Sequence, residues 1–124
     1  MKIEKKFLMN QNRCYAAGHI TVDGQNVALL ATEGEGACYA FSGKDYEHQA
    51  TVWSEPGGCM TFAPLAGTNG EFLTVQRFLK MFQWEEATLV WVRPQPDGTY
   101  LVKDLFKLPY LHRFYAPADA RAAF

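Results

Sequence analysis

Thr88-Leu89-Val90-Trp91-Val92-Arg93 predicts a β-strand more clearly than any other stretch of the chain. β-Branched and aromatic side chains fill it, and both kinds favour strands. The turn sequence Pro96-Asp97-Gly98 follows, and a second apolar run, Tyr100–Phe106, comes after the turn. Two such runs around an Asp-Gly turn predict an antiparallel hairpin. The unbroken apolar centre of the first run predicts an inner strand with Trp91 and Val92 buried.

The strands of this hairpin repeat an arrangement found earlier in the chain. The earlier copy lies about 45 to 51 residues upstream, which is the period of a four-stranded propeller blade. Short strands, Gly-rich connections and few helical stretches fit that architecture. The matching stretches are Val27–Thr32 with Phe72–Gln76, Ala37–Phe41 with Thr88–Val92, and Thr51–Trp53 with Tyr100–Phe106.

We therefore predict an all-β chain of repeated four-stranded antiparallel units, which resemble propeller blades in an incomplete ring. The 124 residues suit a single β domain. The first unit covers about residues 14–56, and the second covers about residues 57–108. Residues 109–124 then begin a third unit with a strand at Tyr110–Phe114 and end in an Ala-rich tail. A small closed β-barrel is the alternative, because about eight strands in a chain of this size also fit one.

The stretch Phe78–Glu86 has the least regular pattern and predicts a long loop with one turn of helix. Aromatic residues make up 15% of the chain, and we expect most of them, including Tyr15 and Phe106, to fill the core. Trp84 is the exception. It lies in the irregular stretch beside two glutamates, so we expect it to be exposed at an interface.

The charge balance argues against several classes of partner. Lys and Arg number 12 and Asp and Glu number 13, for a formal net charge of -1. Without a basic excess we expect no nucleic-acid binding, and without a polybasic cluster we expect no membrane binding. No stretch has the apolar length of a signal peptide or a membrane helix, so we expect a cytoplasmic protein. Three cysteines, Cys14, Cys38 and Cys59, are an odd number and predict reduced thiols.

A resemblance to a known family rests on three phrases, Gly67–Leu73, Ala87–Val92 and Leu108–Phe114. Over roughly residues 7 to 114 the chain resembles the N-terminal part of a bacterial β-propeller family of unknown function, with relatives among the FG-GAP-type repeats. The resemblance implies a propeller fold, of which this chain is a shortened form, and implies no activity. FG-GAP-type repeats often carry an acidic calcium loop, whereas the comparable turn here, Asp23–Asn26, has one carboxylate. Calcium takes 6–8 oxygen ligands, so we expect none at this turn.

The sequence contains no strong catalytic motif, so we predict no catalytic residues, no metal site and no cofactor. The best polar candidates for ligand binding are His112 and Arg113, which would line the axis of a propeller. Arg113 could hold a carboxylate or a phosphate there, and Trp84 joins them as an exposed aromatic contact. A nucleophile–base pair of Cys59 and His112 would require a lowered thiol pKa, for which the sequence gives no reason.

Three functions stay open on these grounds. The lack of catalytic motifs favours a non-enzymatic binding or assembly module. The alternatives are a small-molecule hydrolase with a site on the propeller axis and a lipocalin-like carrier of an apolar ligand. Two units cannot close a ring, because propellers use about 4–8 blades, and open end strands invite pairing with another chain. We therefore expect self-association into a homodimer or a larger oligomer.

Overall fold

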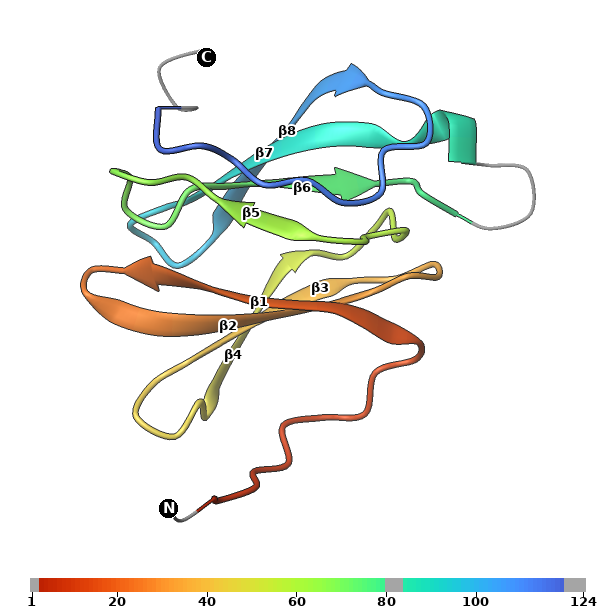
Figure 1. Cartoon of the computed structure of the whole chain (residues 1–124). Helices are drawn as coiled ribbons and strands as arrows, with labels where there is room; N and C mark the ends of the chain where they lie inside the picture. The colour runs from red at the N-terminus through yellow and green to blue at the C-terminus, as the bar shows by residue number, and fades with distance from the viewer. Residues whose placement is uncertain (1–2, 80–83, 120–124) are drawn as a thin grey trace.

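The computed structural model describes residues 3–79 and 84–119 and consists of two four-stranded antiparallel sheets (Figure 1). Within each sheet, every strand pairs with its neighbour in the chain. The prediction of repeated four-stranded units is confirmed, and the described strands close no barrel. The first sheet contains β1 (Cys14–Val22), β2 (Gln25–Thr32), β3 (Cys38–Ser42) and β4 (His48–Trp53), and the second contains β5 (Phe62–Pro64), β6 (Phe72–Gln76), β7 (Thr88–Pro94) and β8 (Tyr100–Lys107).

Two tight turns show how the local sequence sets the pairing of the strands. Asp23 and Gly24 join β1 to β2, with positive φ angles of 51° and 77°. Asp-Gly favours this backbone, which matches the twist of a two-residue hairpin. In the turn from β7 to β8, the Asp97 carboxylate accepts hydrogen bonds from the hydroxyl and the backbone N–H of Thr99, at 2.6 and 3.0 Å. These two bonds stabilise the turn and lower the pKa of Asp97.

The main core lies between the two sheets, which stack face to face in Figure 1. β1 contacts β5 and β4 contacts β8, so equivalent strands of the two units face each other. In β2 the inward side chains, Val27, Leu29 and Ala31, are buried. Phe72 of β6 is fully buried and meets the Phe62 ring edge-to-face, with 5.6 Å between centroids. The stacking is that of two neighbouring blades, as in an incomplete propeller.

The connection from β4 to β5 fastens the two sheets together at one end. Gly58 N donates a hydrogen bond to Gly34 O at 3.0 Å, which joins the connection to the turn between β2 and β3. On its other side, Arg77 N donates to Gly57 O at 2.8 Å, just after β6. The connection therefore contacts both units through its backbone, which requires close approach of three chain segments.

The strand predicted at Tyr110–Phe114 is not formed, so that prediction is wrong. The chain after β8 instead crosses the outer face of the second sheet, where Figure 1 shows the blue segment over β5 and β6. Phe114 packs against two buried clusters there, one with Met60 and Val75 and the other with Leu73. A lone strand gains little without partners, whereas apolar side chains gain by covering an apolar face.

This cover explains why β6 is buried on both faces. All five of its residues are buried, because one face lies against the first sheet and the other against the C-terminal segment. Ala116, at the start of the Ala-rich tail, also packs against the outer cluster. Residues 120–124 of the tail lie outside the described residues.

Two further expectations concern the second sheet. The stretch Phe78–Glu86 contains a short 3-10 helix, η1 (Trp84–Glu86), as one helical turn was predicted, and residues 80–83 lie outside the described part. Val92 is fully buried, as expected. Trp91 is only partly buried, because it points to the outer face, where its indole N–H donates to the Glu71 carboxylate at 2.9 Å. Adjacent residues of one strand point to opposite faces, so an apolar run alone does not make both inward.

Candidate binding surface

The C-terminal segment places His112 beside two aromatic rings. The imidazole centroid lies 6.1 Å from the ring of Tyr15, at the start of β1, and 5.2 Å from the ring of Phe78. The Arg113 guanidinium lies 6.0 Å from the centroid of the same Tyr15 ring. The structure thus brings together the two polar candidates from the sequence, and their aromatic contacts tie the segment to β1.

Through these contacts, His112 and Arg113 have a structural role, because they help to hold the C-terminal segment against β1. An exposed cation–π contact contributes about 0.5–1 kcal/mol. A ligand site requires a concave space with polar groups that converge on it. Neither His112 nor Arg113 lines any of four hollows on the described surface. Binding of a ligand by this pair stays a prediction.

Trp84 belongs to a group of exposed, large apolar side chains around η1. It is 39% exposed, while Phe106, Leu108 and Tyr110 are 54%, 43% and 60% exposed. The chain after β8 returns to η1, since Tyr110 N donates to Trp84 O at 3.0 Å. We call these four residues the apolar patch. Several exposed apolar side chains gathered together mark an interaction surface, whereas isolated ones do not.

The charges beside the apolar patch have both signs. Lys107 Nζ lies 2.8 Å from Glu86 Oε2, and both side chains are more than half exposed. Such a pair adds little to stability in water. The Tyr110 hydroxyl donates to Glu85 Oε1 at 3.1 Å, and this bond raises the pKa of Tyr110. An apolar centre with both charge signs at its rim can complement a copy of itself.

β8 adds a sheet edge to this surface. It is the last strand in the order β5-β6-β7-β8, and no other described strand pairs with its outer side. Phe106 is part of β8, so the edge and the apolar patch are continuous. Open edges present backbone N–H and C=O groups that pair readily with another chain.

Two aromatic residues that were expected in the core are exposed instead. Tyr15 is 42% exposed and Phe106 is 54% exposed, which corrects the prediction. An edge strand and an inner strand are rich in the same residue types, so composition did not separate them. The sequence did contain one sign that Phe106 lies at an edge. Phe106, Leu108 and Tyr110 occupy alternate positions around Pro109, and proline cannot donate a backbone hydrogen bond to a neighbouring strand.

The thiols lack the environment of a nucleophile. Cys59 is fully buried, and its Sγ lies 3.3 Å from the Thr74 hydroxyl. Burial raises the pKa of Cys59 to about 12, and burial also raises the pKa of Cys38. A thiol with so high a pKa holds almost no thiolate at neutral pH. The geometry therefore gives no support to a Cys59–His112 catalytic pair.

We expect one reactive thiol in the folded protein and three after unfolding. All three cysteines are free, but only Cys14 is exposed. A chromogenic disulfide reagent, added with and without denaturant, counts both sets. Cys14→Ser is the control and should remove the fast reaction alone. A single thiol in denaturant would mean that the other two are bonded to each other.

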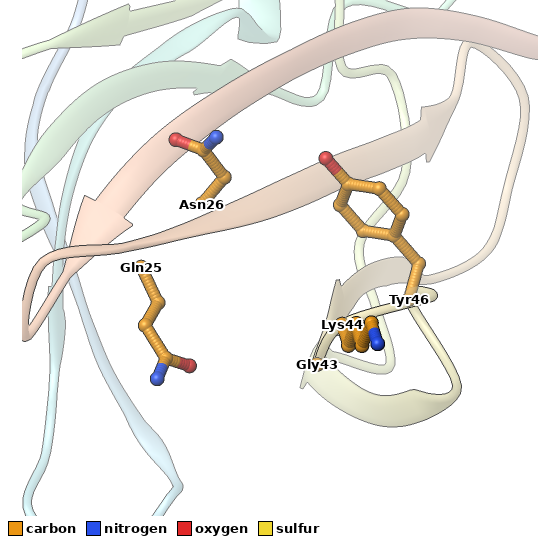
Figure 2. A pocket seen from close by; sticks show the side chains of 5 residues that line it. All are labelled: Gln25, Asn26, Gly43, Lys44 and Tyr46. Carbon is orange, nitrogen blue, oxygen red and sulfur yellow. The ribbon is translucent and has the colours of Figure 1, made fainter.

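One surface hollow, of about 320 Å³, lies between the start of β2 and the β3–β4 hairpin (Figure 2). Figure 2 shows the Gln25 and Asn26 amides extending to opposite sides of β2, with Tyr46 rising from the hairpin. Gly43 and Lys44 complete the lining. The polar atoms do not converge on one point, as a specific ligand site requires.

Comparison with known proteins adds no assignment to this geometry. No family model, curated protein sequence or solved structure matches the chain. Within residues 3–79 and 84–119, no three His, Cys, Asp or Glu side chains gather closely enough to hold a metal ion. None of the helical segments described has the length and apolar character needed to cross a membrane.

Proposed function

We propose that this chain is a non-enzymatic assembly module that associates with a second copy of itself through the apolar patch and the adjoining edge of β8. The observation that carries the proposal is the joint exposure of Trp84, Phe106, Leu108 and Tyr110 beside an unpaired strand edge. Interfaces are enriched in aromatic residues at their centres and polar at their rims. The patch has this composition.

A second copy suits this surface because the surface is self-complementary. Glu86 and Lys107 lie side by side at the rim, so a two-fold axis can bring each charge near its opposite on the other copy. The net charge of -1 gives two copies little reason to repel each other.

The C-terminal segment limits how two copies can meet. It covers the outer face of the second sheet, so another unit cannot stack there as the next blade of a ring. A β-bulge at Leu105, between Asp104 and Phe106, also interrupts the edge of β8. Bulges blunt edge pairing, so the apolar patch provides most of the binding and the edge provides less.

The alternatives have weaker support. A hydrolase needs an activated nucleophile or two carboxylates across a cleft, whereas the buried thiols are protonated. A lipocalin-like carrier needs a closed barrel, and the described sheets are open. Three free thiols suit a reducing compartment, and we place the module in the cytoplasm on that ground.

Light scattering coupled to size exclusion tests the proposal. We expect twice the chain mass of 14.0 kDa, or a higher multiple, at micromolar concentration. Phe106→Glu should return the mass to that of one chain, because it places a charge in the apolar patch. Tyr46→Glu is the control, since Tyr46 is 37% exposed but lies on the β3–β4 hairpin. A wild-type mass of one chain would overturn the proposal.

A further inference from the structure

A second hollow, of about 300 Å³, opens between the two sheets near the turn from β7 to β8. Its floor belongs to the first sheet and includes Val27, Ala40 and Ala50. Its opposite wall belongs to the second sheet and includes Pro94 and Tyr100. The hollow is therefore an opening into the interface of the two sheets, apart from the apolar patch.

Small side chains in the first sheet create this space. Ala40 and Ala50 are directly opposed partners in β3 and β4, so two methyl groups lie side by side on one face. Pro94 and Tyr100 are likewise opposed partners in β7 and β8. The result is a slot with an alanine floor and a wall made of the Pro94 ring and the flat Tyr100 ring. Aromatic rings and flat apolar ligands stack well in such a slot.

At the mouth of this hollow, hydrogen bonds within the protein leave the Asp23 carboxylate and the Thr99 hydroxyl oxygen as acceptors. Asn69 Nδ2 donates to Asp23 Oδ1 at 3.0 Å and holds this carboxylate in place. Thr99 directs its hydroxyl proton to Asp97, at 2.6 Å, which leaves the Thr99 oxygen as an acceptor. Both Asp23 and Thr99 line the hollow. A ligand that satisfies them must bring an N–H or O–H group.

We propose that this hollow binds a small, flat, mainly apolar ring compound that carries one hydrogen-bond donor. The ring lies between the alanine floor and Tyr100, and the donor faces Asp23 or Thr99. Ligand pockets usually measure roughly 300–1,000 Å³, so a hollow at the lower end takes one or two rings. Burial raises the pKa of Tyr100, which keeps the wall uncharged. This site goes beyond self-association and does not depend on it.

Indole and indene form a matched pair of probes, because they share a two-ring shape and only indole has an N–H. We expect indole to shift the backbone amide signals of residues 22–27, 40–50, 95 and 97–100 in a nitrogen-15 NMR titration. We expect indole to bind about tenfold more tightly than indene, which is the usual effect of one hydrogen bond to a charged group. Equal binding of the two probes would overturn the donor-bearing ligand class.

Two variants test the place of binding. Ala50→Leu fills the slot from the floor and should remove the indole-dependent shifts. Ala17→Leu makes the same change at an exposed position of the same sheet and should leave them intact. Shifts centred on the apolar patch, or shifts that survive Ala50→Leu, would overturn the proposal. The mass from light scattering is read separately, so failure of one proposal does not imply failure of the other.

Discussion

Gly57→Ala is expected to destabilise the protein more than any other single-methyl addition, because the two sheets meet at this residue. A β-carbon at position 57 would overlap the backbone oxygen of Gly34. That oxygen also accepts the Gly58 N–H, while Gly57 O accepts the Arg77 N–H. The clash is with backbone, which cannot relax by changing rotamer, and interiors are closely packed. We expect a loss above about 4 kcal/mol in the free energy of unfolding, measured with denaturant.

Gly34→Ala is the matched control at the same junction. A β-carbon there would meet only the Arg13 side chain and the Thr32 hydroxyl, at 3.6 Å and beyond, which is ordinary contact. We expect its free energy of unfolding to change by less than about 1 kcal/mol. Equal denaturant midpoints for the two variants would contradict the close approach of the backbones at Gly57.

Much of the fold could be predicted because its signals are local. The strand read from Thr88–Arg93 corresponds to β7, and Asp23-Gly24 forms the turn that its sequence favours. Both signals depend on residues a few positions apart. The two-fold repetition of such signals was enough to predict repeated four-stranded antiparallel units, which the two sheets confirm.

The error at Tyr110–Phe114 has a different origin. Its aromatic and apolar residues suit a strand, but a strand forms only where a partner has a free edge. The outer face of the second sheet offered the same side chains apolar contact instead, and Phe114 packs against it. Contacts between distant parts of the chain decide whether this stretch pairs as a strand or covers the sheet. The composition of the stretch does not reveal those contacts.

In the candidate surfaces, too, some features follow from the local sequence and others depend on contacts between distant residues. Exposure of Trp84 was predictable, because the irregular pattern around it offered no face to bury. Exposure of Phe106 was not, since it depends on β8 being the last strand of its sheet. The hollow between the sheets depends on the pairing of Ala40 with Ala50 and on what faces them. The sequence alone does not show which alanines of a strand pair with each other or what lies opposite them.

Removal of residues 109–124 is expected to lower the melting temperature sharply and to cause aggregation. Leu111 and Phe114 cover the cluster of Met60 and Val75, and Phe114 also covers the cluster of Leu73. Each fully buried side chain of this kind contributes about 1.5–3 kcal/mol, so uncovering several costs several kcal/mol. Large exposed apolar faces also promote association. Differential scanning calorimetry and light scattering of the shortened chain measure both effects.

Phe114→Ala separates the covering role from mere chain length. Phe114 contacts both outer clusters, so its truncation should cost about 2 kcal/mol, less than the 3–5 kcal/mol of a fully buried phenylalanine. Tyr115→Ala is the control, because Tyr115 is 84% exposed and its loss should change stability by less than about 0.5 kcal/mol. A segment that paired as a strand with another chain would behave differently. Phe114→Ala would then lower the mass measured by light scattering and leave the melting temperature of the single chain unchanged. A lower melting temperature with unchanged mass therefore identifies the segment as the cover of its own sheet.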